Sequence, residues 1–379
     1  MPRTPTIVVD DAIAHAEAAL ADLGVLHLLP AASIDGPTLA SLGAEALIVR
    51  SVTRVDEALL QAAPKLGFVA TATAGVDHLD LRALAARDVT VASAAGCNAQ
   101  AVAEWLATAL LTVRDRVDPA IMAGPVGIVG HGNVGHRAAA LLRKLGWEVL
   151  ACDPPLARAV PTLAPHFVDF AELWRRCPII SFHVPLIREG IDRTVAMVDV
   201  DHPAPAGAKL IVNSSRGPVV RERALDRSDL AAFILDVWDS EPRLSPSRLA
   251  DPRLLLASPH VAGYSLEGKI DATAQVHRAL ASWLGRSPWW TGAELLPTVD
   301  LAADGARDLP TLLHQVVDLP GDDARVRALA TLDEPARSRA FEALRRNYQL
   351  RREFRSCRVG PAADPAILAD AQKIGLITD

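Results

Sequence analysis

The sequence VGIVGHGNVG, from Val126 to Gly135, decides the fold. An apolar stretch typical of a β-strand leads directly into glycines spaced G-x-G-x-x-G, and a helix-like segment follows over 137–145. In the dinucleotide-binding pattern the first glycine permits a tight turn, the second lets the backbone approach a pyrophosphate, and the third lets helix and strand pack closely. The helix N-terminus then offers free N–H groups and a positive dipole end to the phosphates. The predicted cofactor contacts of this loop are Gly130, Gly132, Asn133, Val134 and Gly135.

An acidic residue follows the glycine loop at the spacing that such a site requires. Asp153 comes after a second apolar strand, about twenty residues beyond the loop, where a carboxylate accepts hydrogen bonds from the ribose hydroxyls. A carboxylate there repels a 2′-phosphate, and Pro154 and Pro155 follow in place of an arginine. The sequence therefore predicts NAD, and not NADP, as the cofactor.

Composition narrows the class of protein without deciding it. The chain has 379 residues, more than one ordinary core accommodates, so we expect two or three domains. The net charge of −6 gives no electrostatic basis for binding nucleic acid or an anionic membrane. The four cysteines lack the spacing of metal ligands, and no segment resembles a secretion signal or a membrane span. We therefore expect a soluble, cytoplasmic protein without a metal site.

Strand-like and helix-like segments alternate along most of the chain. In the first hundred residues, short apolar strands alternate with helices, one of them predicted over 11–23. A long apolar helix is predicted over 99–113, and from Val126 to about Pro259 the pattern is again strand, helix, strand. This alternation predicts an α/β fold with two Rossmann-like, doubly wound parallel-sheet lobes. The composition changes after Trp290, which predicts a smaller third module.

Three side chains with useful chemistry come shortly after buried strands of the second lobe. They are Arg216, Glu241 and His260. In open parallel sheets, ligands bind beyond the carboxyl ends of the strands. An arginine can bind a carboxylate, a histidine can take a hydroxyl proton, and a glutamate can orient the histidine. Their position behind a dinucleotide motif predicts a catalytic set for hydride transfer from an alcohol.

Several motifs together resemble the D-2-hydroxyacid dehydrogenase superfamily. Those shared with the superfamily are the glycine loop, NSSRG at 213–217, LDVW at 235–238 with Glu241 and Pro242, and His260. A narrower resemblance, to the erythronate-4-phosphate dehydrogenase family, rests on RSVT at 50–53, TATAGVDH at 71–78, AGCNA at 95–99, CDPP at 152–155 and HVAGYSLEGK at 260–269. RRNY at 345–348 and RREF at 351–354 extend this resemblance into the tail.

The resemblance implies a bilobal enzyme with three domains. Residues 1–98 and 264–289 would form a flavodoxin-like substrate-binding domain, residues 99–263 the NAD-binding Rossmann domain, and residues 290–379 a smaller α+β domain that dimerises the enzyme. The implied activity is NAD-dependent oxidation of 4-phospho-D-erythronate to 2-oxo-3-hydroxy-4-phosphobutanoate in vitamin B6 (pyridoxal 5′-phosphate) biosynthesis. The implied partners are a phosphorylated 2-hydroxy acid and a second copy of the chain.

The resemblance also implies roles for individual residues of the second lobe. Arg216 would bind the substrate carboxylate, and His260 would be the acid/base that removes the hydroxyl proton. Glu241 would hydrogen-bond His260 and hold it in the useful tautomer. Asp236 and Gly263 would lie near the nicotinamide end of NAD.

Substrate contacts are expected from Ser51, Thr73 and Tyr264. Thr71 could exchange roles with Thr73. Positive charge makes three further side chains candidates for the substrate phosphate: Arg50, Arg345 and Arg346.

One position departs from the superfamily pattern. A hydroxyl residue commonly follows the histidine of a strand-end motif, whereas Val184 follows His183 here. A lost hydroxyl contact would weaken NAD binding by about 0.5–1.5 kcal/mol. Because backbone contacts can persist, Val184 stays a candidate cofactor-binding residue.

Two alternative functions remain open on the sequence. The first is another dehydrogenase of the superfamily, a 3-phosphoglycerate dehydrogenase or a hydroxypyruvate reductase. Serine-pathway enzymes often append a β-α-β-β-α-β regulatory domain, whereas this tail is mostly helical and arginine-rich, which disfavours that alternative. The second is a non-catalytic NAD-sensing binding protein. The absence of a proline-rich or basic partner-binding extension disfavours it.

Overall fold

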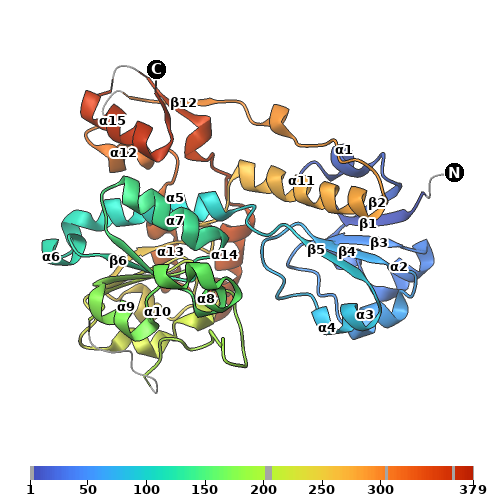
Figure 1. Ribbon diagram of the computed structural model, residues 1–379, viewed down its shortest axis with the longest axis horizontal. Helices are drawn as coiled ribbons and strands as arrows, with labels where there is room; N and C mark the ends of the chain where they lie inside the picture. The colour runs from blue at the N-terminus through green and yellow to red at the C-terminus, as the bar shows by residue number, and fades with distance from the viewer. Residues whose placement is uncertain (1–3, 201–206, 304–305, 361–362, 379) are drawn as a thin grey trace. The chain divides into compact units, whose positions relative to one another are not determined.

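The computed structural model describes residues 4–200, 207–303, 306–360 and 363–378 (Figure 1). The chain divides into two compact units. The first unit comprises residues 1–98 and 266–297, and the second comprises residues 99–265 and 298–379. The α+β module expected over 290–379 is grouped for the most part with the second unit, so its independence as a domain stays a prediction.

A five-stranded sheet forms the centre of the first unit. Its strand order is β2-β1-β3-β4-β5 with all neighbours parallel, which is the flavodoxin-like order. Helices α1 and α11 pack on one face and α2, α3 and α4 on the other (Figure 1). The elements are β1 (Thr6–Asp10), α1 (Ala16–Leu20), β2 (Val25–Leu29), α2 (Gly36–Leu42), β3 (Ala46–Val49), α3 (Glu57–Ala62), β4 (Phe68–Thr71), α4 (Leu81–Ala86), β5 (Thr90–Ser93) and α11 (Leu266–Trp283).

The first helix is much shorter than the predicted segment 11–23. The side chain of Asp10 accepts a hydrogen bond from the backbone N–H of Ala12 at 3.0 Å, which stabilises a turn instead of a helix start. His15 has a left-handed backbone with φ 55°, so regular helix begins only at Ala16. Apolar spacing alone did not reveal this competing turn.

A six-stranded parallel sheet forms the centre of the second unit, in the order β11-β10-β9-β8-β6-β7. Helices α5 and α7 lie side by side over one face (Figure 1). The long helix predicted over 99–113 is α5 itself. The elements are α5 (Ala99–Val113), α6 (Pro119–Met122), β6 (Val126–Val129), α7 (Asn133–Lys144), β7 (Val149–Cys152), α8 (Pro154–Ala159), α9 (Phe170–Arg176), β8 (Ile179–Phe182), β9 (Leu210–Asn213), β10 (Ala232–Leu235), α10 (Pro246–Leu249) and β11 (Leu254–Ala257).

The described part of the C-terminal segment contains a small parallel sheet, β12-β13-β14, which lies with α12 and α15, whereas α13 packs against β11 of the large sheet. Apolar side chains of α12, α15 and the small sheet share a buried cluster with α5 and α7, and Val326 and Phe341 of α13 and α14 share another with β11. These two clusters explain why the segment belongs to this unit. The elements are β12 (Val299–Leu301), α12 (Leu309–Leu313), α13 (Leu319–Ala328), α14 (Glu334–Arg346), β13 (Cys357–Val359), α15 (Pro365–Ile374) and β14 (Ile377–Thr378).

The central strands are mainly apolar because both faces of each sheet are covered. In β1, Ile7 and Val9 face the α1 side while Val8 faces the α2 side.

Among the described residues, no helix combines the length and apolarity needed to cross a membrane.

Candidate active site

The glycine loop lies where the strand order of the second sheet reverses. Strand β6 is flanked by its successors β7 and β8 on opposite sides, and the loop leaves its carboxyl end. Gly130 has φ +86°, and a Cβ on Gly135 would lie 1.9 Å from the Gly130 oxygen, so neither position accepts a side chain. A Cβ on Gly132 would meet nothing within 4 Å, which leaves an open approach to the backbone.

The N-terminus of α7 is available to an anion. The helix begins at Asn133, directly after the open glycine, and no side chain caps it in the described part of the chain. Its first N–H groups therefore point out of the helix without partners from the helix itself. Val134 is partly buried against the apolar core, which fixes the direction of this first turn.

Asp153 connects the glycine loop to the end of β7. Its Oδ2 accepts the backbone N–H of His131 at 2.7 Å, and its Oδ1 caps α8 by accepting the N–H of Leu156 at 2.9 Å. Both contacts hold the carboxylate beside the loop, where an acceptor for ribose hydroxyls is required.

Two buried polar atoms just beyond the neighbouring strands β8 and β9 lack partners within the described residues. They are Nδ1 of His183, just beyond β8, and Oγ of Ser214, just beyond β9. Burial lowers the pKa of His183 to about 3, so its ring is neutral. Buried polar groups are normally hydrogen-bonded, so these two atoms fit a polar ligand at the strand ends. Together with the open glycine backbone and the free helix end, they fit a dinucleotide.

Val184 lies beside the glycine turn. A Cβ on Gly130 would lie 2.8 Å from Cγ1 of Val184. The valine therefore gives the loop an apolar contact where the superfamily commonly has a hydroxyl. Its effect on NAD affinity stays a prediction.

His260 and Glu241 are in direct contact. Nδ1 of His260 lies 2.6 Å from Oε1 of Glu241, and Oε2 of Glu241 accepts the N–H of Trp238 at 3.2 Å. Burial acts to raise the pKa of Glu241, but the hydrogen bonds from His260 and Trp238 outweigh it and lower that pKa below its usual value. The glutamate is therefore an anion that holds one ring nitrogen of the histidine.

Asp236 anchors the loop that carries the histidine. Its buried Oδ1 accepts three hydrogen bonds, from Ser258 Oγ at 2.6 Å, from Val261 N at 2.8 Å and from Ala262 N at 3.1 Å. These bonds hold His260 in a left-handed backbone with φ 59°, a conformation that costs about 1–3 kcal/mol outside glycine. The loop is thus fixed from beneath by a carboxylate at the end of β10.

Arg216 lies beyond β9 on a loop packed against the one that carries Glu241. A Cβ on Gly217 would lie 1.9 Å from the backbone oxygen of Trp238, so only glycine allows this approach. Asn213 holds the turn, because its Nδ2 donates to the Arg216 oxygen at 3.0 Å. The structure thus brings together, on neighbouring loops, the three residues predicted to be catalytic.

Ser51 and Thr73 belong to the first unit and follow β3 and β4. Ser51 is exposed in the turn after β3. Oγ1 of Thr73 donates to the Gly75 oxygen at 3.0 Å and lies 2.7 Å from Oγ1 of Thr71, which in turn lies 3.0 Å from Nε2 of His78. Thr71 is fully buried, so of the two threonines only Thr73 is accessible to a ligand.

Tyr264 is held by the C-terminal segment, a link that the sequence did not indicate. Its hydroxyl accepts a hydrogen bond from Nε of Arg345 at 3.2 Å, and its carbonyl accepts one from Nη1 of Arg351 at 3.0 Å. Arg351 is buried and also donates to the oxygens of Ala262 and Ala101 at 2.6 Å. Gly263 lies within this turn, which the bond from Tyr264 N to the Val261 oxygen closes at 2.8 Å.

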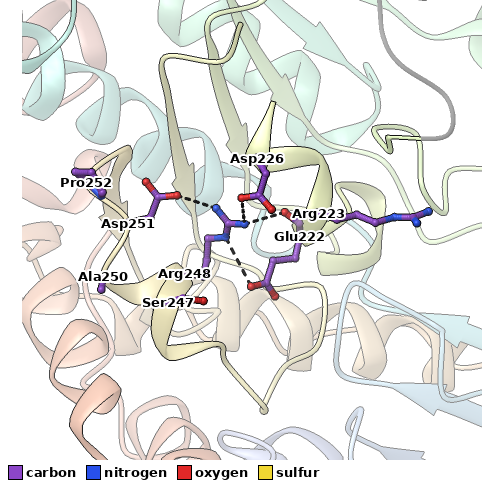
Figure 2. Close-up of a pocket in the computed structure, with 8 residues that line it drawn as sticks. All are labelled: Glu222, Arg223, Asp226, Ser247, Arg248, Ala250, Asp251 and Pro252. Carbon is purple, nitrogen blue, oxygen red and sulfur yellow. Dashed lines mark hydrogen bonds and ion pairs between the residues drawn. The ribbon is translucent and has the colours of Figure 1, made fainter. Parts of the chain in front are cut away.

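A surface hollow of about 630 Å³ lies between α10 and the 3₁₀ turn Glu222–Asp226 (Figure 2). Arg248 fills its centre and pairs with Asp226 at 2.7 Å, Asp251 at 2.9 Å and Glu222 at 3.7 Å. These three carboxylates pair with the positive charge of Arg248, so the residues that line the hollow form a structural ion-pair cluster and not a ligand site. Nowhere in the described ranges do three His, Cys, Asp or Glu side chains gather as a metal site would require.

Comparison with known proteins agrees with this geometry. Residues 99–262 match the model of the D-isomer specific 2-hydroxyacid dehydrogenase NAD binding domain, and residues 295–375 match a domain of unknown function. The erythronate-4-phosphate dehydrogenase of Pseudomonas paraeruginosa is 38% identical over 97% of this chain and 98% of its own length. The enzyme of the same name from Azotobacter vinelandii is 40% identical over 93% of this chain and 94% of its own.

Solved structures of more distant proteins share the fold. The NAD-bound 3-phosphoglycerate dehydrogenase of Entamoeba histolytica superposes with a TM-score of 0.58 at 22% identity, over 74% of this chain and 95% of its own. The Aquifex aeolicus D-lactate dehydrogenase with NAD and lactic acid gives 0.57 at 21% identity, over the same shares.

The fold and the matched NAD-binding domain define an NAD-dependent oxidoreductase that acts on a CH–OH group. The chain belongs to the erythronate-4-phosphate dehydrogenase family.

Proposed function

We propose that the chain uses NAD to oxidise 4-phospho-D-erythronate at its 2-hydroxyl, giving 2-oxo-3-hydroxy-4-phosphobutanoate for pyridoxal 5′-phosphate biosynthesis. Similarity to relatives of that name over nearly the full length of both chains supports this substrate. The contact of 2.6 Å between His260 and Glu241, beside a dinucleotide loop, is the observation that carries the chemistry.

His260 acts as the base through its second ring nitrogen. Because Nδ1 faces the Glu241 carboxylate, that nitrogen carries the proton and Nε2 presents a lone pair. The hydroxyl proton of the substrate passes to Nε2, and the neighbouring glutamate stabilises the imidazolium that forms. The glycine loop and Asp153 would hold NAD, which would supply the acceptor for the hydride from C2.

Arg216 binds the carboxylate of the substrate. A guanidinium can hold both carboxylate oxygens and fix the adjacent C2 relative to the base. Its positive charge also stabilises the electron density that builds on the C2 oxygen. Asp236 keeps the His260 loop in place and, with Gly263, lines the end of the site assigned to nicotinamide.

The residues of the first unit contribute substrate contacts in this proposal. Ser51 and Thr73 supply hydroxyls, and Thr71 with His78 holds the Thr73 side chain in one orientation. Tyr264 supplies a third hydroxyl from the loop after His260.

The assembly and location of the enzyme are part of the same proposal. Residues 290–379 would join two copies of the chain in a homodimer, as the resemblance implies. The four cysteines are buried and form no disulfide in the described part of the chain, which suits the reducing cytoplasm.

The direct test measures NADH formation with 4-phospho-D-erythronate and with 3-phosphoglycerate, and measures formation of the oxidised product when a 2-oxo acid is added. We expect turnover of the four-carbon acid, and more of its product with the 2-oxo acid, which reoxidises NADH and is itself reduced to a 2-hydroxy acid. Preference for 3-phosphoglycerate would refute the substrate assignment. NAD binding without turnover of either acid would refute the enzymatic proposal in favour of an NAD-sensing protein.

A further inference from the structure

We propose that Arg345, on the last turn of α14 in the C-terminal segment, binds the phosphate group of the substrate. This inference rests on the proposed function, because it names the side chain that would distinguish a phosphorylated from an unphosphorylated 2-hydroxy acid. It also gives the C-terminal segment a part in substrate recognition.

The position of Arg345 is set by the loop that carries His260. Its Nε donates to the hydroxyl of Tyr264 at 3.2 Å, and Tyr264 lies four residues beyond the histidine on a closed turn. The Tyr264 ring meets the Tyr348 ring edge-on, with centroids 5.9 Å apart. Arg351 binds the backbone of the same turn. The C-terminal segment therefore backs the catalytic loop and holds Arg345 next to it.

The terminal amino groups of Arg345 remain available to a ligand. Within the described residues, no hydrogen bond or ion pair engages Nη1 or Nη2, although the side chain is half-buried. By contrast, Arg351 binds three carbonyl oxygens and Arg248 binds three carboxylates. Two parallel N–H donors of a guanidinium match two oxygens of a phosphate.

The charges around Arg345 keep it cationic without neutralising it. Burial acts to lower its pKa, but Tyr264, Glu241 and Asp236 outweigh burial and raise that pKa above its ordinary value. The same charge helps to lower the pKa of Glu241. A phosphate dianion near this guanidinium would supply the charge-assisted partner that it lacks in the described part of the molecule.

The two other arginines suggested by charge fit less well. Arg346 is exposed, and a cation in the last turn of a helix is sufficiently explained by the helix dipole. Arg50 donates its Nε to the buried Asp10 at 2.9 Å, so a structural role already accounts for it. Of these three candidate arginines, only Arg345 both contacts the loop that carries His260 and has terminal amino groups that no described residue engages.

The first experiment compares two substrates that differ only in the phosphate. The values of kcat and KM are measured with 4-phospho-D-erythronate and with D-erythronate for the wild type, Arg345→Gln, Arg345→Lys, Arg50→Gln and, as a matched control, Arg346→Gln. We expect Arg345→Gln to lower kcat/KM for the phosphorylated acid roughly 100-fold, mostly through KM. Turnover of D-erythronate should fall by no more than roughly threefold, because Arg345 also contacts Tyr264 and helps to lower the pKa of Glu241. Arg345→Lys should recover part of the loss for the phosphorylated acid, and Arg346→Gln should resemble the wild type.

A purely structural role would lower kcat/KM for both substrates alike, which would overturn the proposal. Loss of the phosphate preference in Arg50→Gln but not in Arg345→Gln would overturn it as well. If the wild type itself shows no preference for the phosphorylated acid, the proposed function has failed, which is a distinct outcome.

A second experiment does not depend on turnover. The melting temperature of the NAD-loaded protein is measured against inorganic phosphate, used as the probe. Phosphate should stabilise the wild type and Arg346→Gln but not Arg345→Gln. Equal stabilisation of all three proteins, or of none, would overturn the assignment of this arginine.

Discussion

The carboxylate of Glu241 bridges the catalytic loop and the backbone of its own turn. One oxygen lies 2.6 Å from Nδ1 of His260, and the other accepts the N–H of Trp238 at 3.2 Å. The glutamate cannot rotate away from the histidine without losing its second bond. The histidine is therefore oriented before a substrate arrives, which is the condition for efficient proton transfer.

Glu241→Gln should lower kcat roughly 10²- to 10⁴-fold while leaving the melting temperature nearly unchanged. The amide keeps the shape of the side chain but can donate to Nδ1, which favours the wrong tautomer of His260. Steady-state kinetics and a thermal melt check this. A kcat within threefold of the wild type would show that the contact does not support the reaction.

Alanine substitution at two glycines of the loop should affect different properties: NAD affinity at Gly132 and stability of the fold at Gly135. Gly132→Ala should leave the melting temperature unchanged, because its Cβ meets nothing within 4 Å and its φ of −73° suits alanine. It should weaken NAD binding at least ~10-fold, because the new methyl obstructs the pyrophosphate. Gly135→Ala should instead destabilise the fold by about 1–3 kcal/mol or more, since its Cβ would overlap the Gly130 oxygen. Calorimetric NAD titrations and melts of both variants test the contrast. Equal NAD affinity in Gly132→Ala and the wild type would contradict it.

A buried carboxyl on α5 should make stability depend on pH. Burial of Glu104, with the neighbouring Glu353, raises its pKa to about 8. Its Oε1 accepts hydrogen bonds from Gln100 Nε2 at 2.9 Å and Phe354 N at 3.1 Å. The folded chain keeps this proton, whereas the unfolded chain loses it near pH 4.3 or so. The protonated Glu104 carboxyl therefore contributes fully to stability below the pKa that Glu104 has in the unfolded chain. This contribution is lost as the pH rises to about 8.

Glu104→Gln should remove that dependence, because an amide keeps the Oε1 acceptor and never ionises. Its free energy of unfolding should match that of the wild type near pH 4.5 and exceed it increasingly up to pH 8, by at most about 1.4 kcal/mol per pH unit. Glu342→Gln, at an exposed position of α14, is the matched control and should show no such trend. Parallel curves for Glu104→Gln and the wild type would disprove the raised pKa.

Asp153→Asn should reduce both NAD affinity and the discrimination against NADP. The amide removes the charge that repels a 2′-phosphate and one acceptor that holds the His131 backbone. We expect NAD to bind about 10-fold more weakly, with a smaller loss or a gain for NADP. Asp169→Asn alters a cap with the same geometry on α9, where Asp169 accepts Glu172 N at 2.7 Å, and should change neither affinity. Titration calorimetry with both nucleotides decides this, and an unchanged NAD-to-NADP ratio in Asp153→Asn would argue against a ribose contact.

Local signals in the sequence were sufficient for much of the fold. The mainly apolar strands and the glycine spacing predicted two parallel sheets, and the apolar run 99–113 predicted α5 to the residue. The apolar pattern gave a wrong helix boundary where a side chain hydrogen-bonds the backbone and stabilises a turn in place of the helix. The turn at Asp10 and the left-handed His15 shortened the predicted helix 11–23 to Ala16–Leu20.

Long-range contacts were the part that the sequence could not supply. Arg351 binds the oxygen of Ala101, 250 positions earlier in the chain, and Arg345 reaches Tyr264 across 81 positions. The motifs RRNY at 345–348 and RREF at 351–354 draw attention to both arginines, but no local pattern indicates which distant residues they contact. Likewise, the three bonds to Asp236 that fix the His260 loop depend on adjacent strand ends, which only the folded sheet brings together.

The most direct test of the central claim follows the hydrogen on C2. With 4-phospho-D-erythronate deuterated at C2, mass spectrometry of the NADH should show one deuterium per molecule formed, and His260→Ala should form almost none. Substrate deuterated only at C3 should give unlabelled NADH. NADH that lacks deuterium after turnover of the C2-labelled acid would contradict oxidation at the 2-hydroxyl and, with it, the roles assigned to His260, Glu241 and Arg216.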